Sequence, residues 1–522
     1  MYNEYYDAKL RKKLHPEMRF VDCPLVDIGS CKKIHIIGVC GTAMGTCALM
    51  LRDSGFDVTG SDISFWPPMG PLLKLNGVKV FEGWNTENIE DDVDLVVVGN
   101  ACAPDHLEVL EAIKKNKPLI SMPEIMGRYY VGDEKESFVV CGTHGKTTTT
   151  GLLAHVLREI GEDPTFLIGG VMQNHFSADK KVGAKTGEKK ELIVGTSHAV
   201  GKGRFAVFEG DEYDTSFFDA RPKFLHYRPS YSIITSVEWD HVDIYPDIPT
   251  YTKAFEHLIE VTKKGLVVAN TYPLLNELIK NATHNADNHI APVLVYGKDS
   301  KADIYPALTK IDHLGQHFEL FLNNESYGDY IVPMYGEYNL LNTLAVLGTM
   351  HQAGIDIKTE RVRNALKSFP GMKRRQEIVS EKNEIIIVDD FAHHPTAVSE
   401  TLKGIRNRFP NRRTVAIFEP RSSTSRRKIF EDTYPSALAE ADIVGLKVPP
   451  YKAEVDDGQD LLNPEKVKIE TEALGKKVYL AESALNLVEV MSPIIEKGDI
   501  VVIMSNGSFD GIHGMLEKAL ER

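Results

Sequence analysis

The sequence predicts an α/β protein with parallel, doubly wound sheets and about three domains. The chain has 522 residues, which is the length of roughly three ordinary domains. Short apolar runs alternate with helical segments, and two of these runs lead directly into glycine-rich turns. This alternation favours parallel sheets, because each helix forms the crossover between neighbouring strands. We place the domains at residues 1–132, 133–372 and 373–522, with residues 1–32 as an N-terminal extension.

The expected elements follow in order along the chain. Residues 33–62 predict a strand, a turn, a helix and a second strand, and further strands are expected at 94–100 and 118–122. In the central region we expect strands at 137–141, 205–209, 231–236 and 266–270, a helix near 251–263, extended chain at 302–334 and a helix at 339–353. Residues 177–203 are rich in Lys and Gly and predict a loop or flexible insertion. The last domain is expected to have strands near 384–389, 414–418, 442–446, 477–480 and 499–504.

Composition and net charge restrict which classes of protein and which binding partners are possible. A hydrophobic content of 43% and a charged content of 26% are typical of a soluble globular chain. The net charge of −14 argues against a nucleic-acid or anionic-membrane partner, although a local basic pocket can still bind an anion. The chain has no apolar stretch of about 18 residues and no apolar signal core, so we expect a cytoplasmic location. The cysteines form no CxxC pair, which favours buried, reduced thiols over a metal site.

The first glycine-rich turn resembles a dinucleotide-binding turn but has different spacing. Its glycines are Gly38, Gly41 and Gly45, whereas the dinucleotide pattern needs glycines at 38, 40 and 43. Cys40 and Ala43 occupy the other two of those positions, so NAD binding is weakly supported. The same glycines can hold the diphosphate of another nucleotide at the N-terminus of a helix. The first domain is therefore expected to be Rossmann-like and to bind a nucleotide.

The second glycine-rich turn predicts a phosphate-binding loop. An apolar run, Ser137–Cys141, leads into Gly-Thr-His-Gly-Lys-Thr-Thr-Thr at 142–149. Glycines let backbone N–H groups approach phosphate oxygens, and the helix that follows favours negative charge. Lys146 can reach the β- and γ-phosphates, and the Thr147 hydroxyl can bind Mg²⁺. The loop is a short version, because Val140 stands where the common pattern has its first glycine, but it still predicts ATP binding.

Two acidic segments follow strands of the central domain. They are Glu-Gly-Asp-Glu-Tyr-Asp at 209–214 and Trp-Asp-His-Val-Asp at 239–243. Ligands bind at the carboxyl ends of strands in open α/β sheets, so these side chains are expected beside the phosphate loop. Carboxylate and imidazole groups there could hold a second divalent ion.

From residue 33 to about residue 520 the chain resembles the Mur ligases of peptidoglycan synthesis. The segments that carry the resemblance are GVCGTAMG, GSD at 60–62, GTHGKTTT, EGDEYD, VEWDHVD, GEYNLLN at 336–342, MKRR at 372–375, DDFAHHPTAV at 389–398, EPRSST at 419–424 and MSNGSFDGIHG at 504–514. The resemblance implies a Rossmann-like UDP-sugar domain, a central P-loop ATPase domain and a Rossmann-like C-terminal domain that binds the incoming amine. Within the family, the chain looks most like the branch active in peptidoglycan recycling. That branch joins L-alanyl-γ-D-glutamyl-meso-diaminopimelate to UDP-N-acetylmuramic acid.

The resemblance also implies roles for individual residues. Those expected at ATP are Gly142, Thr143, His144, Gly145, Lys146, Thr147, Thr148, Asn339, Asn342, Arg375, Asp390 and His393. Lys146, Glu209 and His241 are the expected catalytic residues, and Thr147, Glu209 and His241 are the expected Mg²⁺ ligands. Those expected at the sugar nucleotide or the peptide are Gly38, Gly41, Gly45, Ser61, Asp62, Asn100, Arg421, Ser422 and Asn506. Because all the substrates are anionic, Arg374, Arg375, Arg421, Arg426 and Arg427 are candidate cations for the cleft.

The chain departs from the family pattern at several positions. Phe255 stands four residues after Tyr251, where several Mur ligases carry a carbamylated lysine. The L-alanine-adding branch and the tripeptide branch both lack that lysine, so this difference supports the subgroup. Glu337-Tyr338 replaces the histidine often found before Asn339. Ser508 and Asp510 replace glycines of the C-terminal signature, which makes tripeptide selectivity less secure than ATP use.

Three alternatives remain open at this point. The first is the family member that adds free L-alanine to the same sugar nucleotide. The second is an NAD(P)-dependent oxidoreductase built on the first domain, which Cys40 disfavours. The third is a non-catalytic nucleotide sensor, which the intact Lys146, Thr147, Glu209 and His241 disfavour. The sequence does not identify any protein partner.

Overall fold

The computed structural model describes residues 27–65, 69–173, 196–240, 244–245, 247–284, 290–451, 456, 458 and 460–521. Two compact units can be distinguished. The first contains the chain up to Glu238 together with Pro249–Tyr296 and Ala345–Ala365. The second contains Trp239–Ile248, Gly297–Leu344 and the chain from Leu366 onward. The boundaries of the three domains expected from the sequence stay a prediction.

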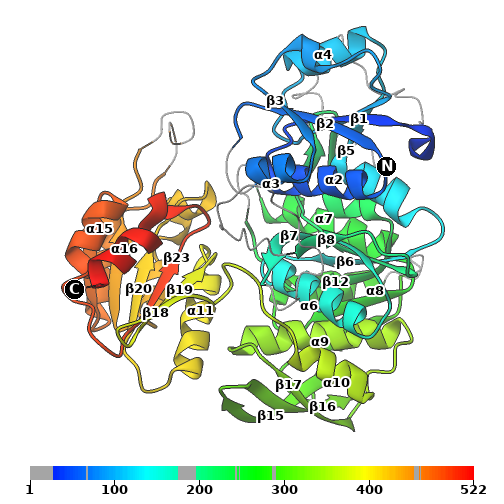
Figure 1. The fold of residues 1–522 in the computed structure, drawn as a ribbon. Coiled ribbons are helices and arrows are strands. Elements are labelled where there is room, and N and C mark those ends of the chain that lie inside the picture. Colours follow the sequence, from blue (N-terminus) through cyan, green and yellow to red (C-terminus); the bar gives the residue numbers. More distant parts are fainter. Residues whose placement is uncertain are drawn as a thin grey trace. The chain divides into compact units, whose positions relative to one another are not determined.

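The first unit begins with a five-stranded parallel sheet in the order β3-β2-β1-β4-β5 (Figure 1). Its strands are β1 Lys33–Ile37, β2 Asp57–Asp62, β3 Lys79–Glu82, β4 Leu95–Val98 and β5 Leu119–Ser121. Its helices are α2 Thr42–Asp53, α3 Met69–Leu75, α4 Leu107–Lys114 and α5 Met122–Ile125. The central strands β1 and β4 are almost entirely buried, as expected when helices cover both faces of a parallel sheet. The strand–turn–helix–strand unit predicted at 33–62 is confirmed.

A second sheet in the first unit has the order β14-β13-β12-β6-β9-β7-β8. Its strands are β6 Glu136–Cys141, β7 Thr165–Met172, β8 Thr196–Ala199, β9 Phe205–Glu209, β12 Pro229–Ile234, β13 Gly265–Ala269 and β14 Val293–Tyr296. Its helices include α6 Lys146–Glu159, α7 Ile248–Val261 and α8 Pro273–His284. Adjacent strands run parallel from β14 through β7, and β8 pairs antiparallel with β7.

The expectation of a loop over residues 177–203 is wrong in part. Residues 196–199 form the edge strand β8, whose His198 pairs with Leu167 of β7. The segment has no apolar alternation to mark it, because an edge strand gains its order from the neighbouring strand. Residues 177–195 lie outside the described part of the chain.

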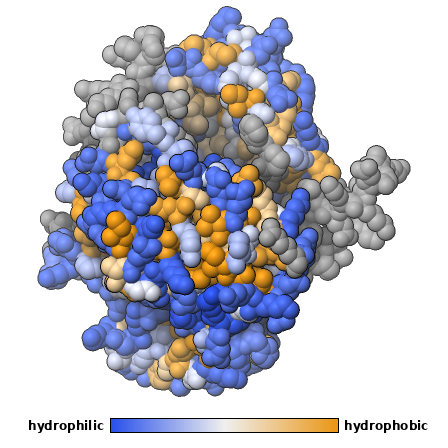
Figure 2. Space-filling model, turned by 90° about the vertical axis from the view of Figure 1, so that its left-hand side faces the viewer, coloured by the Kyte–Doolittle hydropathy of each residue, from blue (hydrophilic) through white to orange (hydrophobic). Residues whose placement is uncertain are grey.

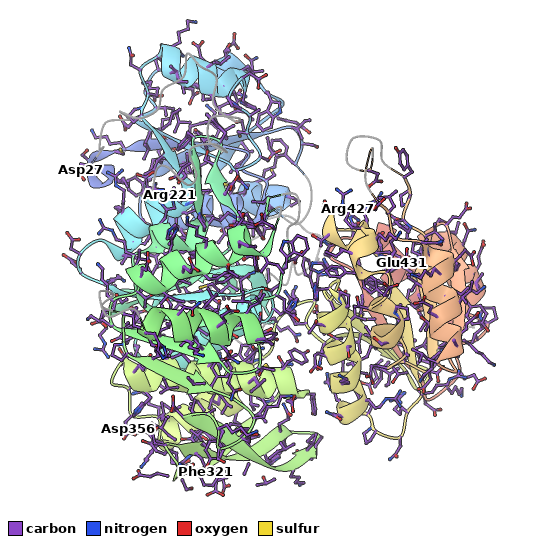
Figure 3. The ribbon with its side chains drawn as sticks, turned by 180° about the vertical axis from the view of Figure 1, so that it is seen from behind. Asp27, Arg221, Phe321, Asp356, Arg427 and Glu431 are labelled. Carbon is purple, nitrogen blue, oxygen red and sulfur yellow. The ribbon has the colours of Figure 1, made fainter. Side chains whose placement is uncertain are left out.

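A short hairpin connects the two sheets of the first unit. It consists of β10 Asp214–Ser216 and β11 Asp219–Pro222, and Phe217 at its turn packs into the core of the first sheet. Figure 3 labels Arg221 on this hairpin, where its guanidinium pairs with Asp219 at 2.5 Å. His226 lies 3.1 Å from the same carboxylate. The acidic segment at 209–214 therefore leads into a hairpin that contacts the first sheet directly.

The second unit contains an antiparallel three-stranded segment and a six-stranded sheet. The antiparallel strands β15 Ile304–Asp312, β16 Gly315–Leu322 and β17 Glu325–Val332 confirm the extended chain expected at 302–334. The six-stranded sheet has the order β18-β19-β23-β20-β21-β22 and is parallel except for β18. Its strands are β18 Glu377–Lys382, β19 Ile385–Asp390, β20 Thr414–Phe418, β21 Ile443–Lys447, β22 Lys477–Ala481 and β23 Ile500–Met504.

Helices cover both faces of the six-stranded sheet and create two apolar cores. One core packs α11 Pro395–Arg408, α12 Tyr434–Leu438 and α14 Pro464–Ala473 against one face. The other packs α15 Ala484–Met491 and α16 Ile512–Leu520 against the opposite face. The chain also contains α9 Glu337–Gln352 and α10 Glu360–Lys367. This arrangement confirms the doubly wound α/β fold class.

The visible surface mixes polar and apolar residues. Figure 2 shows hydrophilic side chains over much of one face, with apolar residues gathered in patches between them. Within the ranges described, no helix combines the length and the hydrophobicity needed to cross a membrane. Cys31, Cys47, Cys102 and Cys141 are buried free thiols, and Cys40 is half-buried.

Candidate active site

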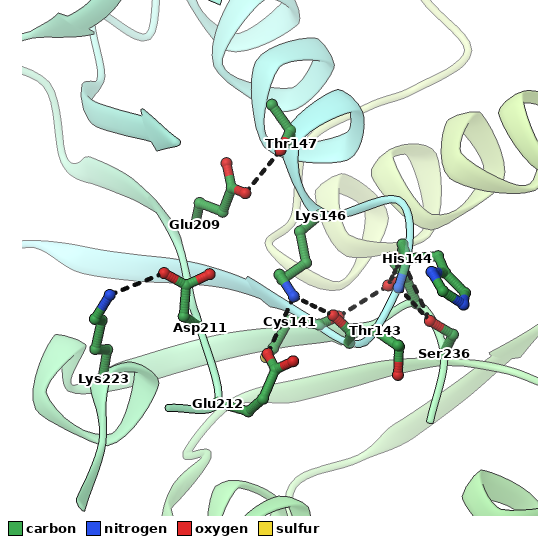
Figure 4. A network of polar contacts seen from close by, with 12 residues as sticks. Cys141, Thr143, His144, Lys146, Thr147, Glu209, Asp211, Glu212, Lys223 and Ser236 are labelled. Carbon is green, nitrogen blue, oxygen red and sulfur yellow. Dashed lines mark hydrogen bonds and ion pairs between the residues drawn. The ribbon is translucent and has the colours of Figure 1, made fainter. Parts of the chain in front are cut away.

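The phosphate loop lies between β6 and α6 at the carboxyl edge of the second sheet (Figure 4). Gly142 and Gly145 have φ angles of +125° and +85°, which other residues adopt only with strain. A Cβ atom at Gly142 would also lie 2.4 Å from Thr235 Oγ1. Gly145 is the N-cap of α6, so the first N–H groups of that helix are available to an anion. These two glycines therefore form a backbone cradle for phosphate.

The neighbouring strand end holds this loop in place. The His144 N–H donates to Ser236 Oγ at 2.8 Å, and its imidazole lies 2.7 Å from the Glu238 carboxylate. Thr143 Oγ1 donates to the Glu238 carbonyl at 2.8 Å and lies 2.9 Å from the Tyr251 hydroxyl. These contacts fix the loop on the side of β12.

Lys146 is buried and already has an anionic partner. Its Nζ donates to the Gly142 carbonyl at 2.6 Å and to Glu212 Oε2 at 3.0 Å. The Lys146 side chain is 11% exposed and Glu212 is fully buried. Burial alone would lower the pKa of Lys146, but the Glu212 and Asp211 carboxylates outweigh it and hold that pKa above its usual value. The lysine is therefore cationic, and a phosphate would compete with Glu212 for it.

Thr147 and Glu209 lie side by side next to the loop. Thr147 Oγ1 donates to Glu209 Oε1 at 2.7 Å, and the Gly169 N–H donates to Glu209 Oε2 at 2.7 Å. Burial raises the pKa of Glu209, and the nearby Asp211 carboxylate raises it further. Among the described residues, Glu209 forms no ion pair. A hydroxyl and a buried carboxylate are hard oxygen donors, and they fit a divalent ion such as Mg²⁺. The third expected ligand, His241, lies outside the described residues.

The first sheet presents its glycine turn at its own carboxyl edge. Gly38 has φ +81°, and the Gly38 and Val39 N–H groups donate to the Ser61 carbonyl at 2.9 and 3.0 Å. Asp62 Oδ2 accepts from the Cys40 N–H at 2.8 Å and so supports the turn. A Cβ at Gly45 would lie 2.9 Å from the Val39 carbonyl, so this glycine permits close packing of α2. Gly41, the N-cap of α2, belongs to this turn, and Asn100 follows the neighbouring strand β4 as an exposed residue.

The Ser61 side chain points into the domain rather than toward solvent. Its Oγ donates to Glu108 Oε2 at 2.5 Å and lies 3.2 Å from His35 Nε2. Glu108 also accepts from Asn88 Nδ2 at 2.6 Å. Burial lowers the pKa of His35 to about 3, so this histidine is neutral. The Ser61 hydroxyl therefore belongs to a buried network that positions the end of β2.

The remaining residues expected at ATP, from Asn339 onward, lie in the second unit. Asn339 and Asn342 are buried on α9, where Asn342 Nδ2 donates to Asn339 Oδ1 at 3.3 Å. The Arg375 guanidinium lies 5.0 Å from the Phe391 ring centroid. Asp390 accepts from the Gln376 and Ala392 N–H groups, both at 2.8 Å, so its carboxylate orders the backbone around Arg375. His393 Nδ1 lies 3.0 Å from the Phe391 carbonyl.

Arg421, Ser422 and Asn506 lie where β20 and β23 end side by side. A Cβ at Gly507 would lie 2.4 Å from Arg421, so the arginine side chain crosses that glycine. The Ser422 hydroxyl donates to Ser425 Oγ at 2.9 Å and accepts from the Ser425 N–H, which uses it inside its own turn.

Two of the arginines expected to line the cleft are internal cross-links. Arg374 donates to the Ser505 and Gly507 carbonyls at 2.6 and 2.7 Å and pairs with Asp389 at 3.2 Å. Arg426 is buried and paired with Asp456. Their charges are thus compensated within the domain.

The acidic segment 209–214 was expected beside the phosphate loop, but the ion pair of its Glu212 with Lys146 was not. Sequence reasoning also missed the contact of Tyr251 with Thr143 and the pair formed by Lys447 and Glu419. A usable signal existed for Lys447, because a charged residue ends the otherwise apolar strand β21. Charged residues at the carboxyl ends of parallel strands face the ligand edge of such a sheet.

Comparison with known proteins identifies the class. The model for the Mur ligase family, catalytic domain, matches residues 33–130. The Mur ligase middle domain matches residues 140–350, and the Mur ligase, glutamate ligase domain, matches residues 374–507. The chain belongs to the Mur ligase family and is an ATP-dependent ligase that forms carbon–nitrogen bonds. The resemblance inferred from its motifs is confirmed.

Two curated relatives and one solved structure are similar to this chain over most of its length. The UDP-N-acetylmuramate--L-alanyl-gamma-D-glutamyl-meso-2,6-diaminoheptandioate ligase of Escherichia coli (strain K12) is 32% identical over 497 residues, 94% of this chain and 98% of that protein. The UDP-N-acetylmuramate--L-alanine ligase of Ligilactobacillus salivarius is 33% identical over 474 residues, 90% of this chain and 93% of that protein. The crystal structure of a murein peptide ligase from Psychrobacter arcticus is similar with a TM-score of 0.65 and 30% identity, over 94% of this chain and 98% of that one.

Proposed function

We propose that this chain joins UDP-N-acetylmuramic acid to the tripeptide L-alanyl-γ-D-glutamyl-meso-diaminopimelate, with conversion of ATP to ADP and phosphate. The observation that carries the proposal is the phosphate cradle, in which Lys146 and the adjacent Thr147–Glu209 pair line one loop. The E. coli relative named for this reaction supports the choice of substrates. The enzyme would act in peptidoglycan recycling in the cytoplasm.

The first step activates a carboxylate, because a free amine does not displace a carboxylate oxygen at neutral pH. A lactyl carboxylate oxygen attacks the γ-phosphorus, the bond to the ADP oxygen breaks, and an acyl phosphate forms. Lys146 exchanges Glu212 for a phosphate oxygen and neutralises charge on the transferring group. Thr147 and Glu209, with His241, would hold Mg²⁺, which supplies further positive charge at the phosphates.

The second step forms the amide. The unprotonated amine of the tripeptide attacks the acyl carbon, and phosphate leaves with the former carboxylate oxygen. Because an α-amine has an unperturbed pKa of about 8, a base must accept its proton. His241 or a carboxylate near it is proposed for this role.

The other ligands are assigned by position in the fold. The carboxyl edge of the first sheet, with Gly38, Gly41 and Asn100, would receive the sugar nucleotide, with its diphosphate at the N-terminus of α2. Arg421 and Asn506 at the edge of the six-stranded sheet would receive the peptide.

The L-alanine-adding reaction is the second candidate, because the relative from L. salivarius carries that name at similar identity. Turnover measured with different amine substrates distinguishes the tripeptide-adding reaction from the L-alanine-adding reaction. Phosphate release is measured with ATP and UDP-N-acetylmuramic acid, in the presence of the tripeptide, L-alanine or no amine. Faster turnover with the tripeptide supports the proposal, and faster turnover with L-alanine replaces it. Turnover that needs neither amine nor sugar nucleotide would refute both.

A further inference from the structure

The segment that follows β9 concentrates negative charge beside the phosphate cradle. Glu209, Asp211 and Glu212 lie within four positions of one another, and two of them contact the loop or the start of α6 (Figure 4). Glu209 accepts a hydrogen bond from Thr147, and Glu212 pairs with Lys146 at 3.0 Å. ATP brings further negative charge to the same loop. It therefore has to bind where the protein itself presents three carboxylates.

Asp211 has a lysine partner of its own. Lys223 Nζ lies 3.1 Å from Asp211 Oδ2, and the two side chains are 12% and 24% exposed. The same ammonium lies 4.6 Å from the centroid of the Tyr213 ring, and the Lys223 N–H donates to the Tyr213 carbonyl at 3.3 Å. Lys223 is the first residue of the 3₁₀ helix η5 Lys223–Tyr227. These contacts hold a positive charge against Asp211, which Figure 4 shows between the ammonium groups of Lys223 and Lys146.

The charge of Asp211 reaches the groups that line the cradle. Burial lowers the pKa of Lys146, but Glu212 and then Asp211 outweigh that effect and hold the pKa above its usual value. Burial raises the pKa of Glu209, and Asp211 raises it further. A charge that acts on both Lys146 and Glu209 also acts on an anion held at the same loop. The negative charge of Asp211 would therefore oppose ATP unless a cation cancels it.

Lys146 cannot supply that cation once a phosphate is bound. It has to exchange Glu212 for a phosphate oxygen, which leaves Glu212 without its lysine. In the described part of the chain, Lys223 pairs with no carboxylate other than Asp211. Its charge is therefore committed to this one carboxylate.

We propose that Lys223 is a positioning residue for ATP, which cancels the charge of Asp211 so that the phosphates can approach Lys146. The inference rests on the proposed role of Lys146 at the phosphates and does not depend on which amine is ligated. A pair that only stabilises the fold predicts that removing either partner is harmful. A pair that cancels charge predicts that removing Lys223 weakens ATP binding, whereas removing Asp211 does not.

The test measures the dissociation constant of the full-length protein for ATP by calorimetry at a fixed Mg²⁺ concentration. Lys223→Met leaves Asp211 without its cation, so ATP should bind about tenfold more weakly. Asp211→Asn removes the negative charge and keeps Lys223, so ATP should bind at least as tightly as it binds the parent. The double variant that combines both changes should return to within about twofold of the parent. Lys223→Arg keeps the charge and should stay within about threefold.

Two matched controls remove one charge elsewhere. Lys264→Met breaks the 2.9 Å pair with Glu136, the first residue of β6, at the opposite end of that strand from the phosphate loop. Asp432→Asn removes an exposed carboxylate that pairs with Lys466 in the second unit. Both variants should bind ATP like the parent. A melting curve for each variant verifies that the binding constants refer to folded protein.

Weaker ATP binding in both Lys223→Met and Asp211→Asn, or in neither, would overturn the inference. If Lys223→Met does not fold, the double variant decides: parental affinity supports the inference, and a loss of affinity overturns it. The comparison of amine substrates can fail without affecting this test, because neither sugar nucleotide nor amine is present. Lys146→Ala with parental affinity for ATP would remove Lys146 from the phosphate site, and the inference would fail together with that part of the proposed function.

Discussion

The phosphate loop of the first unit and the C-terminal strand edge of the second both place a buried lysine against carboxylates. Lys146 contacts Glu212 and the Gly142 carbonyl at the start of a helix. Lys447 joins Glu419 and Asp510 at the end of a strand. Lys146 can exchange Glu212 for a phosphate because a ligand approaches it through the loop. Lys447 is held by two carboxylates instead of one, so a ligand would have to displace both to take over the lysine. One lysine is therefore expected to act in catalysis, and the other to hold a binding site in shape.

The largest effect is expected for Lys146→Ala. The transferring phosphoryl group loses a positioned cation, which typically costs about 10²–10³ in kcat. The protein should remain folded but melt at a lower temperature, because the buried Glu212 loses its cation. Steady-state phosphate release and circular dichroism check both points. Wild-type turnover would remove Lys146 from the mechanism.

A different outcome is expected for Lys447→Met. The substitution leaves Glu419 buried without its cation, and breaking a buried pair in this way costs about 3–5 kcal/mol of stability. The melting temperature should fall, and saturating ATP should not restore it. A variant as stable as the parent would contradict the structural role.

Glu212→Gln tests whether a nucleotide takes over the lysine that Glu212 holds, an exchange not expected at Lys447. Lys146 then lacks its anionic partner until a nucleotide arrives, so the nucleotide-free protein should melt at a lower temperature than the parent. ATP supplies the missing negative charge, and the ATP-induced rise in melting temperature should exceed that of the parent. Thermal shift with and without ATP measures both quantities. An equal rise in the two proteins would show that Glu212 and ATP do not compete for the lysine.

The smallest of these effects is expected for Glu209→Gln. The amide keeps an oxygen for a divalent ion but loses the charge, so half-saturation should need about tenfold more Mg²⁺. The Thr147 contact and the fold should survive. Activity at a series of Mg²⁺ concentrations tests this prediction, with Asp432→Asn as a charge-matched control. An unchanged Mg²⁺ titration would exclude Glu209 as a ligand.

Much of the fold and part of the site could be predicted from the sequence. The phosphate loop is a contiguous segment, so Gly142, Gly145 and Lys146 were predictable from spacing alone. The partners of Lys447 lie 28 and 63 residues away from it, so no local pattern joins them. The buried network at Ser61 was missed for the same reason, because Glu108 is 47 positions further along the chain. Strand β8 was missed because its order comes from pairing with β7.

The fate of one oxygen atom shows directly whether the carboxylate is activated as an acyl phosphate. UDP-N-acetylmuramic acid labelled with ¹⁸O in its lactyl carboxylate is converted with ATP and the tripeptide, and the released phosphate is analysed by mass spectrometry. If the carboxylate attacks the γ-phosphorus to form an acyl phosphate, each turnover transfers one carboxylate oxygen to inorganic phosphate. Phosphate that carries no label, despite formation of the amide, would contradict this account of the reaction.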